Sequence, residues 1–310
     1  MRRKSAALIF ILIAAFLFSS CADDGRAEAV LHPDDGEYAF NYLDGIFDAD
    51  VASPQAFVYD VNSDAVIFSK GEDKVVYPGS TAKLLTALYA LTVLSPDEVI
   101  TAGDELELVK PGSSIAYIKK GHRLSVEMLI EGMLIPSGND AAYVLAAAVG
   151  RKTAGDASLG AQKAISAFIE GVNAYAAEIG LCGTEITVPD GYAYEEQYTT
   201  TEDMLLICRS AAKNEIIAKY ASMHTDSVVY ASGHTNTWTN TNLLLDKNSS
   251  YYSPFATGLK TGSINGEYSL VFTFKYADGR EYIAGVFGAD SKNTRFGDAC
   301  KIIEMLEIHA

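Results

Sequence analysis

The sequence has few positive charges, and this shortage limits the partners that the protein can bind. Among its 310 residues, 24 are lysine or arginine and 40 are aspartate or glutamate, which gives a formal net charge of −16. A surface this acidic repels phosphate backbones, so bulk electrostatics exclude nucleic acid as a partner. Apolar residues make up 49% of the chain and charged residues 21%, a balance typical of a folded globular protein.

Cysteine and histidine are also scarce. The four cysteines and five histidines follow no metal-ligand spacing, so we expect no structural metal. Three cysteines remain after Cys21, and the globular composition described above excludes a disulfide-rich miniprotein. We interpret Cys182, Cys208 and Cys300 as buried free thiols, and a Cys182–Cys208 disulfide stays open as an alternative.

Long apolar runs are absent except near the N-terminus. Basic residues at positions 2–4 precede the apolar run Ala6–Phe18, which has the length of a secretory signal and is short for a bilayer span. The following Ser19–Ser20–Cys21 resembles the lipobox of bacterial lipoproteins, although Phe18 departs from the usual aliphatic residue. We therefore predict a signal peptide at 1–20 and a lipid on Cys21, with plain secretion and an uncleaved anchor as alternatives.

The remaining chain divides into a tether and one domain. Residues 21–45 are rich in small and acidic residues and predict a flexible tether, and residues 46–310 form the folded domain. Hydrophobic patterns predict strands first, then a block of helices, then more strands and a final helix, which indicates an α+β fold. The expected strands are 55–61, 65–70, 266–276 and 281–288, and the expected helices are 80–94, 125–134, 140–149, 161–179, 201–212 and 295–308.

Three short motifs carry candidate chemistry. Ser80 and Lys83 are three positions apart at a helix start, so the lysine amine can reach the serine hydroxyl and accept its proton. Ser137–Gly138–Asn139 lies between two expected helices, and Lys260–Thr261–Gly262 precedes an expected hairpin. Each motif alone is typical of caps and turns, whereas all three in this order indicate an active site.

The trio of motifs resembles that of the penicillin-recognising serine enzymes, and in particular the D-alanyl-D-alanine carboxypeptidases. Segments 77–88, 134–142, 198–200, 240–244 and 257–262 are similar to family segments, and the resemblance spans about residues 50–308. It implies a β-lactamase/transpeptidase-like fold, with an antiparallel sheet, flanking helices and an inserted helical subdomain. Asn265–Gly266–Glu267 departs from the family's common Ala-Gly, which we expect to alter the rim of the pocket.

The resemblance also implies a role for each matching residue. Ser80 is the nucleophile, Lys83 its base, and Ser137 relays a proton to the leaving amine. Asn139 binds the substrate amide, and the backbone N–H groups of Ser80 and Ser263 form the oxyanion hole. Lys260 supplies a positive field that keeps Lys83 neutral, Thr261 binds the substrate carboxylate, and Arg295 is a weaker candidate for the same task. No metal or organic cofactor is implied.

The implied partners are peptidoglycan stem peptides and β-lactam antibiotics, and we expect a monomer. The chain ends after the expected final helix, so a lipid on Cys21 would hold it at the outer face of the bacterial membrane. Three alternatives stay open. They are D,D-endopeptidase or transpeptidase activity on cross-links, a class A β-lactamase, and a non-catalytic wall-binding lipoprotein. No Glu-x-x-x-Asn segment lies between Asn139 and Lys260, which argues against the β-lactamase.

Overall fold

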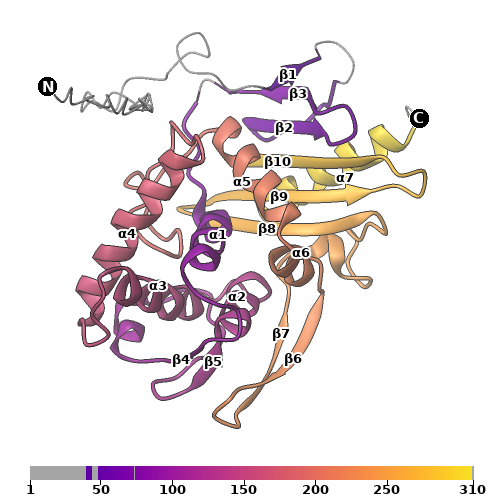
Figure 1. Ribbon diagram of the computed structural model, residues 1–310. Coiled ribbons are helices and arrows are strands. Elements are labelled where there is room, and N and C mark those ends of the chain that lie inside the picture. Colours follow the sequence, from indigo (N-terminus) through magenta and orange to yellow (C-terminus); the bar gives the residue numbers. More distant parts are fainter. Residues whose placement is uncertain (1–39, 44–47, 73, 309–310) are drawn as a thin grey trace, which may run out of the picture.

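The computed structural model describes residues 40–43, 48–72 and 74–308 (Figure 1). The predicted signal peptide and Cys21 lie outside the described residues. Asn41–Tyr42 form strand β1, which belongs to the predicted tether 21–45 yet pairs with strand β3. The ring of Phe40 also packs edge-on against Tyr59. Part of the predicted tether, residues 40–42, therefore packs against the folded domain.

A six-stranded sheet forms the centre of the molecule, with strands from both ends of the chain side by side. Its neighbouring strands are antiparallel except for β1 and β3, which run parallel. The order across the sheet is β1 (Asn41–Tyr42), β3 (Ala65–Lys70), β2 (Gln55–Asp60), β10 (Glu281–Ala289), β9 (Glu267–Lys275) and β8 (Ala256–Ile264). Strand β8 is thus an edge strand.

Side chains of the sheet alternate between two hydrophobic cores, as the two-residue period of a strand requires. On one face, Val58 and Phe272 pack with Phe296 of helix α7 (Lys292–Ile308). On the other face, Phe57 and Val271 join the core of the helical region. Both faces are covered, so β2, β9 and β10 are almost continuously buried.

The helical region lies between β3 and β8 in the sequence and covers the face opposite α7 (Figure 1). Helix α3 is buried along nearly its whole length because it packs against α1, α2 and α4. The helices are α1 (Lys83–Val93), α2 (Val126–Leu134), α3 (Asn139–Thr153), α4 (Ala161–Glu178), α5 (Thr201–Lys213) and α6 (Glu215–Ala221). Short 3-10 helices span Gly79–Ala82, Asp104–Leu108 and Leu243–Leu245, and two small ribbons pair β4 (Val99–Thr101) with β5 (Arg123–Ser125) and β6 (Thr225–Val229) with β7 (Thr235–Thr239). No helix in the described part of the chain is long and apolar enough to cross a membrane.

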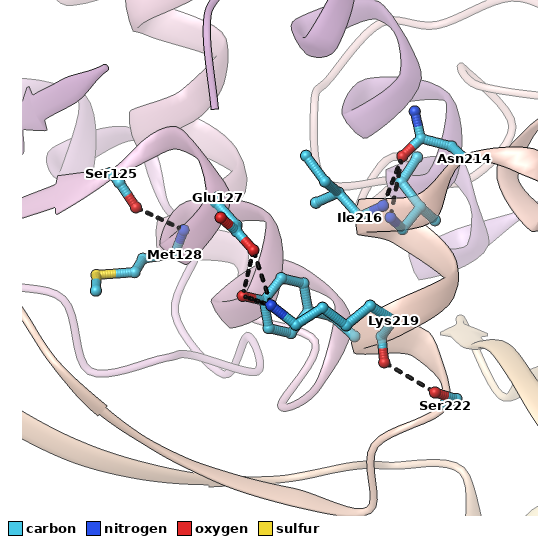
Figure 2. Close-up of polar contacts among 9 residues, drawn as sticks. Ser125, Glu127, Met128, Asn214, Ile216, Lys219 and Ser222 are labelled. Carbon is cyan, nitrogen blue, oxygen red and sulfur yellow. Dashed lines mark hydrogen bonds and ion pairs between the residues drawn. The ribbon is translucent and has the colours of Figure 1, made fainter. Parts of the chain in front are cut away.

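A polar cluster joins α2 to α6, the helix that packs against β8 (Figure 2). Ser125 caps α2 by accepting a hydrogen bond from the backbone of Met128, and Asn214 caps α6 through Ile216 and Ile217. Between the two helices, Glu127 accepts hydrogen bonds from Lys219 at 3.0 Å and from the Tyr220 hydroxyl at 2.7 Å. The first turn of α2 is thereby tied to α6, which in turn packs against the edge strand.

The α+β class and the predicted strands and helices are confirmed, with boundary shifts of a few residues. Helix α6 and strand β8 were not predicted, since α6 has seven residues and β8 contains two glycines and a lysine. Cys208 forms no disulfide, so the Cys182–Cys208 alternative is wrong. Cys208 is buried as expected, whereas Cys182 is exposed.

Candidate active site

Ser80 lies in the 3-10 turn that leads into α1, and this turn packs directly on strand β8. Gly79 has a φ of +51°, and a Cβ at this position would lie 3.0 Å from the backbone nitrogen of Ser263. A side chain here would push the turn away from the strand, so glycine permits the close approach. The turn that carries Ser80 is consequently held against the backbone of Ser263.

Lys83 is fully buried under Ser80 and has three polar neighbours. Its Nζ lies 2.7 Å from Ser80 Oγ and donates to Asn139 Oδ1 at 2.8 Å and to the carbonyl of Asp190 at 2.9 Å. The latter two oxygens are acceptors. A neutral amine with two N–H bonds can satisfy both and still direct its lone pair at the Ser80 hydroxyl. The geometry therefore suits a base that takes the proton of Ser80.

The charge state of Lys83 is set by two opposing effects. Burial lowers the pKa of Lys83 to about 8, because the charged form loses its hydration. The carboxylates of Asp190 and Asp140 act against this and favour the ammonium. A pKa near 8 leaves a substantial neutral fraction of Lys83 under mildly alkaline conditions.

The loop Ser137–Gly138–Asn139 leads into α3 and brings the Asn139 side chain to Lys83. Ser137 has a φ of +62°, a left-handed conformation that is uncommon for a residue with a side chain and is often found at functional sites. Asn139 begins α3, and its backbone N–H donates to the carbonyl of Ser114. Asp140 accepts hydrogen bonds from the backbone of Ala116 and Ile118, so the loop and segment 114–118 support each other.

Lys260 and Thr261 are buried residues of strand β8. Burial lowers the pKa of Lys260 well below its ordinary value, and the nearby charges of Lys83 and Arg295 act in the same direction. Lys260 donates to the carbonyl of Thr261, whose hydroxyl lies 2.6 Å from that of Thr241. We expected a charged Lys260 to keep Lys83 neutral. The two lysines do interact, because the charge of Lys83 lowers the pKa of Lys260, whereas the carboxylates of Asp190 and Asp140 favour the ammonium form of Lys83. The role of Lys260 stays a prediction.

Arg295 supports the edge strand from behind. Its guanidinium donates to the Gly262 carbonyl at 2.7 Å and contacts Ser263 Oγ at 3.2 Å. Arg295 is 3% exposed, and it also lies over the ring of Tyr268. This contact set positions β8 and Ser263 and does not bring Arg295 to the Thr261 hydroxyl. Ser263 itself is exposed at the edge of the pocket.

Two features of the site were missed in the sequence. Asp190 contacts Lys83 through its carbonyl, and Gly191 follows with a φ of +82°. A Cβ on Gly191 would lie 1.9 Å from the Gly79 carbonyl oxygen, so this turn packs directly on the turn that carries Ser80. The Asp-Gly pair signals a turn, yet nothing local indicates that it reaches Lys83. The Thr241 contact with Thr261 was likewise not foreseen, although segment 240–244 was singled out.

Comparisons with known proteins agree with this geometry. The profile of the family described as D-alanyl-D-alanine carboxypeptidase matches residues 45–291. A D-alanyl-D-alanine carboxypeptidase of Streptomyces sp. strain K15 is 30% identical over 317 residues, which cover 98% of each chain. The carboxypeptidase DacF of Bacillus subtilis is 25% identical and DacD of Escherichia coli is 27% identical. The alignments cover 86% and 79% of this chain but 65% and 60% of those longer relatives.

Solved structures show the same fold. The crystal structure of the Streptomyces K15 DD-transpeptidase has a TM-score of 0.73 at 28% identity, covering 84% of this chain and 98% of that one. A D-alanyl-D-alanine carboxypeptidase from Mycobacterium tuberculosis has a TM-score of 0.71 at 23% identity, covering 85% and 94%, and this likeness concerns the fold alone. The match of the family profile across most of the chain, together with the full-length relative, shows that this chain belongs to the D-alanyl-D-alanine carboxypeptidase family.

Proposed function

We propose that this protein is a serine D-Ala-D-Ala carboxypeptidase that removes the last D-alanine from peptidoglycan stem peptides. The observation that carries the proposal is the buried Lys83, whose Nζ lies 2.7 Å from Ser80 Oγ and whose pKa is lowered to about 8. The family and its curated relatives supply the substrate class. Peptidoglycan lies outside the cytoplasm, so the enzyme acts there.

The chemistry divides into acylation and deacylation. Ser80 Oγ attacks the carbonyl between the two D-alanines while Lys83 Nζ takes the hydroxyl proton, and the Ser80 and Ser263 N–H groups stabilise the oxyanion. The C–N bond breaks, Ser137 passes a proton to the leaving amine, and free D-alanine departs. Water then attacks the ester and restores Ser80. Asn139 holds the substrate amide, and Lys260 with Thr261 binds the terminal carboxylate.

β-Lactams should acylate the same hydroxyl, which gives a direct test. We expect penicillin to add its mass to one peptide that contains Ser80, and Ser80→Ala to abolish both the adduct and D-alanine release from a defined pentapeptide. Ser166→Ala, which changes an exposed serine on α4, is the matched control and should behave as wild type. An adduct that survives Ser80→Ala would refute the assignment of the nucleophile. A protein that stays unlabelled by fluorescent penicillin would instead be the non-catalytic alternative.

Transfer to an amine is the second candidate, because the K15 relative's structures carry the name DD-transpeptidase. The acyl-enzyme is the same in both reactions, and the acceptor decides the product. Adding glycylglycine to the pentapeptide assay distinguishes them. Hydrolysis gives the tetrapeptide, whereas transfer gives a tetrapeptide extended by two glycines. A predominant extended product at millimolar acceptor would replace carboxypeptidase by transpeptidase as the main activity.

We also propose that a lipid on Cys21 attaches the protein to the outer face of the bacterial membrane. This attachment is supported by the basic start, the apolar run Ala6–Phe18 and the Ser19–Ser20–Cys21 junction. In a bacterial host we expect Cys21→Ser to move the protein from the membrane fraction to the soluble exported fraction. Cys182→Ser is the matched control, since that cysteine is exposed on the folded domain. A Cys21→Ser protein that stays with the membrane would contradict the lipid anchor.

A further inference from the structure

Strand β8 sets out the groups that contact the substrate in a fixed order, and this order gives the direction of a bound peptide. Lys260 and Thr261 would receive the terminal carboxylate, and the backbone of Ser263 lies against the turn of Gly79 and Ser80, where the proposed function places the scissile carbonyl. An extended peptide advances about 3.3 Å per residue. The residue on the N-terminal side of the scissile D-alanine, the third of the stem, therefore continues past Ser263 toward the end of β8.

A rigid turn follows at that end. Ile264 and Glu267 are paired across a two-residue hairpin whose central residues, Asn265 and Gly266, have φ values of +48° and +82°. Two positive φ values in an Asn-Gly pair are typical of the tight turn that joins antiparallel strands. Glu267, the first residue of β9, is thus held in one place relative to Ser263. These are the residues at which the sequence departs from the family's common Ala-Gly.

Two tyrosines lie beside the Glu267 carboxylate. The Tyr194 hydroxyl donates to Glu267 Oε1 at 3.0 Å, and the Tyr194 ring lies 4.5 Å from that of Tyr77. Tyr77 is three residues before Ser80, and Tyr194 is four residues after Asp190, so the same two segments also supply contacts of Lys83. All three side chains are partly exposed. Among the described residues, no lysine, arginine or histidine forms an ion pair with Glu267.

An unpaired carboxylate next to aromatic rings is complementary to an ammonium group. The carboxylate retains acceptor sites beyond the one that Tyr194 occupies, and aromatic faces attract cations. The side chain of a lysine or diaminopimelate at the third stem position carries such an ammonium several ångströms from its Cα. We propose that Glu267, with Tyr194 and Tyr77, binds the free ammonium group of the third stem residue and makes the enzyme selective for peptides that carry it. This inference rests on the proposed function, which supplies the orientation of the peptide.

The test compares two peptides that differ in one charge. Pentapeptides with lysine at the third position, either free or acetylated on the side-chain nitrogen, are assayed by D-alanine release. We expect wild-type kcat/KM to be about fivefold higher for the free ammonium, as for a partly exposed ion pair assisted by aromatic rings. Glu267→Gln should reduce this ratio to about one. Glu170→Gln, which removes an exposed charge on α4, should keep the wild-type ratio.

The outcomes separate this inference from the proposed function. Equal rates on both peptides in the wild-type enzyme, or an unchanged preference in Glu267→Gln, would overturn the ammonium site while leaving the carboxypeptidase intact. Release of D-alanine from neither peptide would refute the proposed function itself and the inference with it. The wild-type comparison stands even if Glu267→Gln misfolds, which circular dichroism would show. A pentapeptide with diaminopimelate at the third position then shows which residue supplies the ammonium group. A rate of D-alanine release equal to that of the lysine peptide supports both residues, and a lower rate supports lysine.

Discussion

Replacing Asp190 by asparagine separates the charge of this residue from its hydrogen bonds. The carbonyl that accepts from Lys83 belongs to the backbone, and an asparagine Oδ1 can still accept from the N–H of Tyr192 as Asp190 Oδ1 does. The substitution therefore removes mainly a negative charge that favours the ammonium form of Lys83. We expect the pKa of Lys83 to fall, and the acidic limb of the acylation profile to move to lower pH.

The lysine pKa sets the size of the effect. With a pKa of about 8, roughly one tenth of Lys83 is neutral at pH 7 and about nine tenths at pH 9. Wild-type acylation should thus rise about tenfold between these values if the neutral amine is the base. At pH 7, Asp190→Asn can accelerate acylation by at most about tenfold, because the neutral fraction cannot exceed one. At high pH the variant should reach a lower plateau, since a less basic amine accepts the proton less readily.

Stopped-flow acylation by a chromogenic cephalosporin, measured from pH 6 to 10, records both limbs. Glu170→Gln serves again as the control for loss of one acidic charge far from the pocket. A midpoint that stays near 8 in Asp190→Asn would mean that this carboxylate does not act on Lys83. A midpoint that moves to higher pH would refute the electrostatic reasoning altogether.

Three further expectations concern binding and stability. Lys260→Ala should raise KM for the pentapeptide by about tenfold or more, because a buried amine that donates to the substrate carboxylate is lost, and an unchanged KM would remove Lys260 from carboxylate binding. Glu131 is buried, and desolvation raises its pKa to about 8, so this carboxyl group lowers the free energy of unfolding as pH rises from 4.5 to 8. In urea titrations, Glu131→Gln should therefore raise the free energy of unfolding at pH 8 by on the order of 3 kcal/mol, with little gain at pH 4. Gly191→Ala places a Cβ 1.9 Å from the Gly79 carbonyl oxygen, so it should lower the free energy of unfolding by about 3 kcal/mol in the same assay and abolish labelling by penicillin. A stable variant that is still labelled would show that the two turns can separate.

Elements with strong periodicity were predictable, and elements that serve the site were not. Helix α2 spans 126–134 against a predicted 125–134, because its apolar positions repeat at helical spacing and Ser125 caps it. Strand β8 shows no clear alternation of apolar and polar residues. Its glycines Gly258 and Gly262 allow close approach of neighbouring segments, and Lys260 places an amine in the strand. The Asn265–Gly266 hairpin signal was present in the sequence but was not used, which concealed the β8–β9 pairing.

The candidate site divides in the same way. Ser80, Lys83 and Asn139 were predictable from local motifs, and their side chains do meet. Asp190 was not, because a Pro-Asp-Gly turn has the same appearance wherever it occurs, and its contact with Lys83 joins positions 107 apart. The orientation of Arg295 was likewise a tertiary property. Its position on α7 sends the guanidinium to the back of β8, where the Gly262 carbonyl is available.

Both ends of the described chain join in one sheet, so we expect the protein to become active only after its C-terminal strands have been synthesised. Strands β2 and β10 are neighbours, and the Asp298 side chain accepts from the backbone of Ser53, 245 positions away. Contacts this remote in sequence slow folding, since a long loop must close before they form. A nascent chain that ends before β8 already contains Ser80 and Lys83, the proposed nucleophile and base, but lacks Ser263, whose N–H we propose as part of the oxyanion hole. Penicillin should therefore label only chains that have completed the fold. A chain truncated before β8 should remain unlabelled although it contains Ser80.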